Sequence, residues 1–214
     1  DISVINKLKA TQGENSALGE ENLTETDKFS REFFSTVAAL SQTGSLDQAT
    51  ADKISASLAE KVQNPAQKKI YTLTDIKVIQ DNSVTAVKTY NSTMDNVHSK
   101  YPVKENVMEI LQKFIIDENN VDISVLEELT PIIQQTQGVI SGMLKIDVPE
   151  SLAALHINYV NELQKFSENL SAIQLFDTDP IVALGGISNF EENIDLMKSA
   201  VIELDGAVQE KLNN

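Results

Sequence analysis

The chain has 214 residues and a formal net charge of −15, because 32 acidic residues stand against 17 Lys and Arg. Such a surface repels nucleic-acid phosphates and anionic lipid headgroups, so neither is expected as a partner. The lack of Cys excludes disulfides, thiolate zinc sites and thiol nucleophiles. Low aromatic content, 8 Gly and 5 Pro are typical of a helical protein with few turns.

The amino-terminal segment 1–21 is polar after a short apolar start and predicts a flexible tether. The chain begins at Asp1 and not at Met, which favours a leader removed or an anchor trimmed upstream; an ordinary disordered terminus is the alternative. No run of about 18 apolar residues occurs, so no transmembrane segment is expected in the chain as given. Residues 22–214 are expected to form a single helical domain, with amino-terminal helices over 22–100 and a bundle over 103–214.

The first half of this domain predicts three helices and one connector. A helical pattern starts at residue 22 and stops at Gly44, and a second helix continues to the Asn64-Pro65 pair, so the two are expected to form a hairpin. Residues 69–80 are β-branched and alternating, but this stretch is the only one of its kind. A lone strand has no sheet to join, so an extended connector is predicted there. A third helix is expected over 82–100.

The middle of the chain predicts two more helices separated by a polar loop. Residues 103–116 have the apolar spacing of an amphipathic helix, and a loop is expected over 117–120. Ser124 and Glu127 have the spacing of a capping box at the start of the following helix. Pro131 either bends that helix or lies near its true start.

The last third of the chain has near-heptad periodicity. Residues 147–150 combine a cap, a Pro and a Glu, which predicts a helix start. An acidic turn at 177–180 then separates two long helices within 149–212, which are expected to pack antiparallel. Gly185-Gly186 leaves open a kink or a short break. The apolar positions recur at spacings of three and four at Leu152, Leu155, Tyr159, Leu163, Phe166, Leu170 and Ile173, and then at Ile187, Phe190, Ile194, Met197, Val201, Leu204, Val208 and Leu212.

These patterns predict an all-α fold. The expected architecture is an elongated helical bundle of six or seven helices with a long antiparallel carboxy-terminal helical hairpin. An apolar stripe stays partly exposed when it is wider than one neighbouring helix can cover. A second copy of the chain would bind to the exposed part, so self-association is also expected.

One acidic loop resembles a calcium site in spacing only. Asp117, Asn119 and Glu128 occupy the first, third and twelfth places of a loop between two predicted helices. Val121 stands where the fifth position needs an oxygen ligand, and Asp122 stands where the sixth needs Gly. The three oxygen-bearing residues are therefore weak candidates, and no metal or cofactor is predicted.

The two histidines lie in different predicted helices, without paired carboxylates at ligand spacing. His98 ends a helix, where a cation interacts favourably with the helix dipole. His156 borders the apolar stripe and is expected to be a partly buried core residue with satisfied hydrogen bonds. No catalytic residue is assigned, although His156 and Glu150 would be the nominees if the chain carried an unfamiliar carboxylate-based site. A cavity lined by Tyr159, His156 and acidic side chains is the basis for an alternative function, the binding of a small ligand or cation.

A resemblance covers residues 148–212. The matching residues are Val148-Pro149-Glu150-Ser151-Leu152, Leu155-His156, Asn161, Asp179-Pro180, Ala183-Leu184 and Gly186. This pattern resembles one found in uncharacterised exported helical proteins of small-genome candidate-phylum bacteria. In that group the helical body follows an amino-terminal signal or anchor and a polar linker, which implies an exported, envelope-associated protein. The resemblance implies no activity and no binding residue.

The expected function is that of a non-enzymatic structural or protein-interaction module with an unidentified protein partner. Caps and core positions account for most of the distinctive residues, which leaves too few convergent reactive groups for an active site. The expected location is the cell envelope or the outside of the cell, with the cytoplasm as the alternative.

Overall fold

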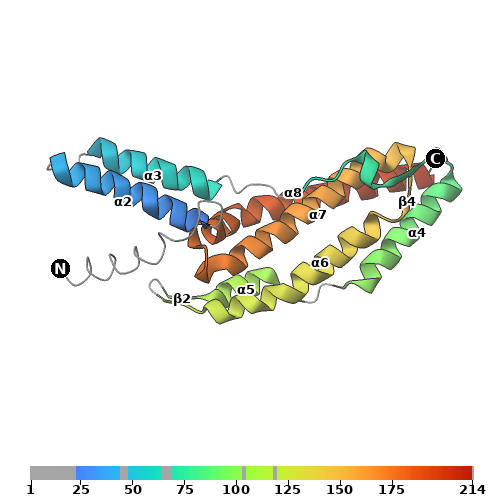
Figure 1. Cartoon of the computed structure of the whole chain (residues 1–214). Helices are drawn as coiled ribbons and strands as arrows, with labels where there is room; N and C mark the ends of the chain where they lie inside the picture. Colours follow the sequence, from blue (N-terminus) through green and yellow to red (C-terminus); the bar gives the residue numbers. More distant parts are fainter. Residues whose placement is uncertain (1–22, 44–47, 64–68, 103–104, 118–119, 214) are drawn as a thin grey trace.

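The computed structural model describes residues 23–43, 48–63, 69–102, 105–117 and 120–213. Within these residues the chain forms seven α-helices, which confirms the predicted all-α class and elongated shape (Figure 1). The predicted tether at 1–21, the stop at Gly44 and the Asn64-Pro65 pair lie outside the described residues. The helices are α2 (Glu25–Thr43), α3 (Gln48–Gln63), α4 (Val84–Lys100), α5 (Val107–Phe114), α6 (Leu129–Met143), α7 (Ala153–Ile173) and α8 (Pro180–Asn213).

The long carboxy-terminal hairpin is confirmed. Helices α7 and α8 lie antiparallel along the whole body, and the 3₁₀ turn Gln174–Asp177 joins them (Figure 1). Their apolar stripes are buried against each other and against α4, α5 and α6. Apolar side chains fall on the shared face at every turn, so burial of that face holds the two helices together. The most buried members are Leu152, Val160, Leu170, Ile173, Leu204 and Val208.

The Gly185-Gly186 pair does not interrupt α8, which is continuous from Pro180 to Asn213. A Cβ on Gly186 would lie 2.9 Å from Ile173 Cγ1 and 3.0 Å from the backbone O of Asn169. The Asn169 side chain also donates to the Gly186 carbonyl at 2.7 Å. Gly186 is therefore a close-contact point between α7 and α8. A Cβ on Gly185 would lie 2.7 Å from the backbone O of Val62, on α3, so neither glycine marks a break in the helix.

A short parallel strand pair corrects two predictions. Lys77–Ile79 (β1) pairs with Asp147–Pro149 (β4), with Val78 opposite Val148. The stretch 69–80 is thus no lone connector, because its partner lies about 70 residues further along. Residues 147–149 form this strand and do not cap a helix; a 3₁₀ turn at Glu150–Leu152 follows, and α7 begins only at Ala153.

The start of the 69–80 stretch is fixed to α7 by one side chain. The amide of Asn161 accepts from the backbone N–H of Tyr71 at 2.7 Å and donates to the Tyr71 carbonyl at 2.9 Å. This two-point contact satisfies backbone groups that no neighbouring strand pairs, so the chain crosses α7 in one orientation.

The middle helices differ from prediction at their ends. Helix α5 ends at Phe114, so the predicted helix over 103–116 is too long at both ends. The predicted capping box is absent, because Asp122 and not Ser124 caps the 3₁₀ helix Ile123–Glu128 that precedes α6. Pro131 is the third residue of α6, where a backbone N–H has no intrahelical acceptor, so it lies near the helix start and causes no bend.

The core has two parts along the long axis. One part joins α4, the second half of α6, the start of α7 and the end of α8. The other part joins α5, the first half of α6, the end of α7 and the start of α8. Met197, on α8, packs against both parts. The core is therefore continuous along α7 and α8, with the shorter helices covering different ends.

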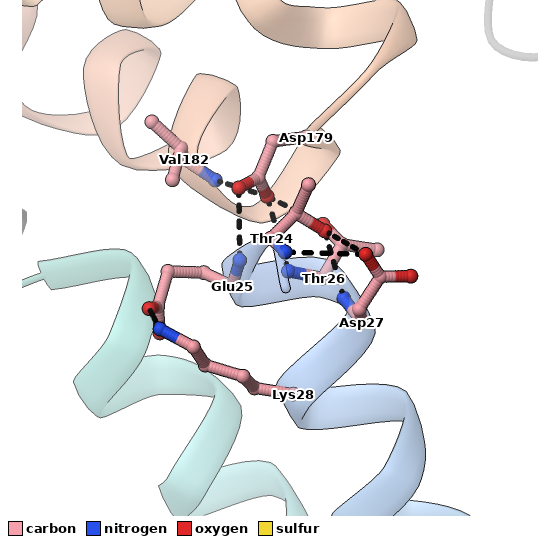
Figure 2. A network of polar contacts seen from close by, with 7 residues as sticks. All are labelled: Thr24, Glu25, Thr26, Asp27, Lys28, Asp179 and Val182. Atoms are coloured by element: carbon pink, nitrogen blue, oxygen red, sulfur yellow. Dashed lines mark hydrogen bonds and ion pairs between the residues drawn. The ribbon is translucent and has the colours of Figure 1, made fainter. Parts of the chain in front are cut away.

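The α2–α3 pair lies side by side and meets the rest of the molecule at the start of α8 (Figure 1). The buried carboxylate of Asp179 accepts from the backbone N–H groups of Glu25 at 2.9 Å and Thr26 at 3.1 Å, and from the Thr26 hydroxyl at 2.7 Å. It also accepts from Val182 N–H at 3.5 Å in the first turn of α8. Figure 2 shows this carboxylate between the amino termini of both helices. One acidic side chain thus caps two helices at once.

Candidate functional site

The predicted polar loop after α5 is a β-hairpin. Ile115–Asp117 (β2) pairs antiparallel with Asn120–Val121 (β3), and Ile115 lies opposite Val121. The Asp122 N–H closes the base of the hairpin by donating to the Phe114 carbonyl at 2.8 Å. Figure 1 places β2 beside α5, at the end of the body away from the carboxy terminus.

The acidic residues of this loop have hydrogen-bond or ion-pair partners within the protein. Asp117 accepts from the Asn120 side chain at 2.9 and 2.8 Å, and Asp122 accepts from the Ser124 N–H at 3.1 Å. Glu128 pairs with Lys113 at 3.0 Å. Asp117 and Glu128 therefore have different partners, and Asn119 lies outside the described residues. In the part of the chain that the structure describes, no group of three acidic or His side chains is placed to hold a metal ion.

The hairpin presents large apolar side chains to solvent. The exposed fraction is 57% for Ile115, 64% for Ile116, 40% for Val121 and 37% for Ile123. We call these four residues the hairpin patch. Ile115 and Val121 are directly paired, so their side chains lie on the same face, whereas Ile116 points to the opposite face. Apolar surface is thus present on both faces of a two-stranded hairpin, where a folded core normally covers at least one.

Sequence reasoning missed this patch because it extended the preceding helix through Ile116. A signal was present: the β-branched pair Ile115-Ile116 and the later Val121 flank an Asp-Glu-Asn-Asn stretch. β-branched residues on both sides of such a stretch are typical of a short hairpin. The amphipathic spacing of α5 concealed the signal, since it fits a helical continuation equally well.

His156 is a buried structural residue. Its Nε2 lies 3.2 Å from the Met143 carbonyl, which can only accept, so Nε2 carries the proton. Its Nδ1 then accepts from the Tyr90 hydroxyl at 2.9 Å. Burial lowers the pKa of His156 to about 4, so the ring is neutral at pH 7. Both ring nitrogens are engaged, as predicted for a satisfied core histidine, although the ring is fully and not partly buried.

The other nominated residues do not join His156. Glu150 is exposed and accepts from the Gln80 side chain at 3.3 Å. The Tyr159 hydroxyl, on α7, lies 3.3 Å from Nε2 of His98, on α4. His98 lies in the last turn of α4, as expected, and burial lowers its pKa, which disfavours the charged form that would interact with the helix dipole.

Two open polar grooves occur among the described residues. The first, of about 460 Å³, is lined by Lys69, Gln137, Gln164, Ser167, Glu168 and Ser171. The second, of about 470 Å³, lies along α4 and includes Asp81, Thr85, Thr89, Tyr90, Lys145 and Asp147. Neither groove is lined by His156 or Tyr159, so these grooves do not form the predicted cavity. In the first, Gln137 donates to Ser167 Oγ at 2.7 Å and Gln164 donates to Glu168 at 2.8 Å, so its lining groups largely satisfy one another.

No helix within the described ranges has the length and apolar composition needed to cross a membrane. Comparisons with family models, with curated proteins and with solved structures found no match to this chain. The comparisons thus assign no functional site. The hairpin patch is the candidate site because its apolar side chains are exposed.

Proposed function

We propose that this chain is a non-enzymatic protein-interaction module that binds a partner protein through the hairpin patch. The observation that supports the proposal is the exposure of Ile115, Ile116 and Val121 on a hairpin with uncovered faces. Contiguous exposed apolar side chains mark interaction sites, because leaving them in water is unfavourable. Burying one such side chain contributes about 1.5–3 kcal/mol.

The setting of the hairpin supports this role. The Asp122–Phe114 backbone hydrogen bond and the Asp117–Asn120 contact fix the strands before a partner arrives. A preformed site loses little conformational entropy on binding, so more of the burial energy is available for affinity. The hairpin also lies beside α5, at the end of the α4–α8 bundle that is away from the carboxy terminus (Figure 1).

Location at the cell envelope or outside the cell is part of the proposal. Its support is the resemblance of residues 148–212 to exported helical proteins. Protease treatment of intact source cells, followed by detection of the chain, tests the location: cleavage supports exposure outside the membrane, and full protection contradicts it.

The binding role is tested by cross-linking in source cells with variants matched in chemistry. Ile116→Thr removes apolar surface but keeps a β-branched residue that suits a strand. Ile202→Thr is the control, because Ile202 is an equally exposed isoleucine, 70% accessible, on α8. The proposal expects a cross-linked partner with the wild type and with Ile202→Thr, and loss of the same partner with Ile116→Thr. A set of cross-linked proteins that is identical for all three chains would contradict it.

A second candidate function is the binding of a small polar ligand in the groove of about 460 Å³ beside α6 and α7. The observation in its favour is a lining that combines Lys69 with amide, hydroxyl and carboxylate groups. A thermal-shift screen with sugars and amino acids separates the two functions. A ligand effect abolished by Gln137→Leu and unaffected by Ile116→Thr would support this alternative, and no shift with any compound would count against it.

A further inference from the structure

From the hairpin's backbone and charge we infer that the partner contributes an extended, positively charged segment, which adds to the β2–β3 hairpin as a third strand. The inference rests on the proposed function and specifies the chemistry of the partner. Three features support it: an open strand edge, apolar side chains beside that edge, and a concentration of negative charge around it.

The first feature is the open edge. Within the described residues, β2 and β3 pair only with each other. In an antiparallel pair, alternate residues of each strand direct their N–H and C=O groups away from the partner strand. Natural proteins normally protect such an edge with charge, Pro or a covering element. The protection of β2 is partial, because the strand is short and ends on Asp117. The second feature is the apolar side chains on this strand: Ile115 and Ile116 are exposed, so an added strand would find both backbone partners and apolar contacts.

The third feature is local charge. Residues 105–128 contain seven acidic residues and one basic residue, Lys113. This short segment thus carries a net charge of −6 out of −15 for the whole chain. Lys113 is itself paired with Glu128 at 3.0 Å, whereas Glu109 and Glu127 are exposed on the elements before and after the hairpin. Opposite charge on an approaching segment speeds association and selects it among competing strands.

The same charge argues against the other occupants of an open edge. Pairing two hairpins from two copies would bring two segments of net charge −6 together, and like charges across an interface cost several kcal/mol. Nucleic acid and anionic lipid are repelled for the same reason. An apolar strand with Lys or Arg at alternate positions is not repelled by this negative charge.

The test uses the whole chain and a short blocked peptide in which Val and Lys alternate, labelled for fluorescence anisotropy. Two peptides serve as controls: one replaces every Lys by Glu, and one replaces the central Val by Pro, which cannot donate to a ladder. We expect binding of the Val-Lys peptide to be at least about tenfold tighter than that of either control. Ile116→Thr should weaken it about tenfold, and Ile202→Thr should leave it unchanged.

Hydrogen exchange separates strand addition from general attraction to an acidic protein. Bound peptide should slow exchange of backbone amides within 115–121 and leave those of α8 unchanged. Equal binding of the Pro control, or protection spread over the acidic surface, would overturn the inference. Slower exchange of 115–121 with rising protein concentration and no peptide would show a second copy on the edge and would also overturn it.

The two proposals fail in different ways. If cross-linking in cells depends on Ile116 but the Val-Lys peptide does not bind, the interaction role stands and the strand chemistry is wrong. If no cross-linked partner depends on Ile116, the proposed function itself fails, whatever the peptide does.

Discussion

The hydroxyl of Thr26 donates to the carboxylate of Asp179 at 2.7 Å and accepts from the Ile181 N–H at 3.1 Å. Asp179 in turn accepts from two backbone N–H groups at the start of α2. The first turns of α2 and α8 are therefore linked by two side chains, each of which contacts the other helix. A carboxylate is favourable at this place because both helix dipoles present their positive ends to it.

Replacing Asp179 by Ala is expected to destabilise the chain by about 1–3 kcal/mol, since buried N–H groups at two helix starts lose their acceptor. Urea unfolding measures this difference. Asp177→Ala is the matched control, because Asp177 is an exposed acidic residue in the same turn and its loss should change stability by less than about 0.5 kcal/mol. Equal effects of the two substitutions would show that net charge, and not the double cap, is responsible.

Two glycines of α8 should respond in opposite directions to substitution by Ala. Gly186→Ala would place a Cβ 2.9 Å from Ile173 and 3.0 Å from the Asn169 backbone, so a loss of about 1–3 kcal/mol is expected. Gly206 has no atom within 4 Å of an added Cβ, so Gly206→Ala should stabilise the exposed helix by about 0.5–1 kcal/mol. Thermal unfolding of both variants checks the signs. A stabilising Gly186→Ala would contradict the close contact between α7 and α8.

The stability of the chain should fall between about pH 6.5 and pH 4. Burial lowers the pKa of His156 from 6.5 to about 4, so in this window the unfolded chain binds a proton that the folded chain does not. Stability is therefore fully present above the unfolded pKa and decreases by at most about 1.4 kcal/mol per pH unit below it. The lowered pKa of His98 acts in the same direction.

The pH prediction is checked by urea unfolding at several pH values, with the wild type and His156→Gln compared. Carboxylates titrate in both chains, so the difference in slope isolates the imidazole. The slope should be smaller in the variant. Identical slopes would mean that the pKa of His156 is the same in the folded and unfolded chains, which would contradict the prediction.

Calcium should leave the melting temperature unchanged. Asp117 is held by Asn120 and Glu128 by Lys113, so these candidate ligands do not converge. At about 1 mM calcium, a site with a Kd of about 10 μM would stabilise the fold by about 2.7 kcal/mol, which a thermal scan detects easily. A rise in melting temperature with calcium that disappears in Glu128→Gln would contradict this prediction and would support a metal site at this loop.

The long helices were predictable because their information is local. The spacing of apolar residues from Leu152 to Ile173 and from Ile187 to Leu212 defines a helix face at every turn. The acidic turn predicted at 177–180 does separate the two helices, and α8 begins at Pro180, because a turn followed by Pro depends only on neighbouring residues. Local spacing could not reveal that Asp179 also caps α2, since its partners Glu25 and Thr26 lie about 150 positions away in the sequence.

The strands were missed for the same physical reason. Val78 pairs with Val148, about 70 residues away, so the alternating stretch 69–80 had no visible partner in the sequence. In a strand only three residues long, alternation carries little information, and at Asp147–Pro149 a helix-start pattern outweighed it. The hairpin patch was missed because Ile115 and Ile116 were assigned to the end of the predicted helix over 103–116, and only the fold shows that their side chains are exposed.

The Asp179 contact also constrains the order in which the molecule is assembled during synthesis. Helix α2 leaves the ribosome before the other described helices, yet its acceptor is made 153 residues later. The α7–α8 hairpin closes over a short turn and so forms quickly once it is made, whereas docking of α2 has to close a far longer loop. Helices α2 and α3 are thus translated before α7 and α8 but dock after them, and a chain stalled before residue 179 would hold α2 without its anchor.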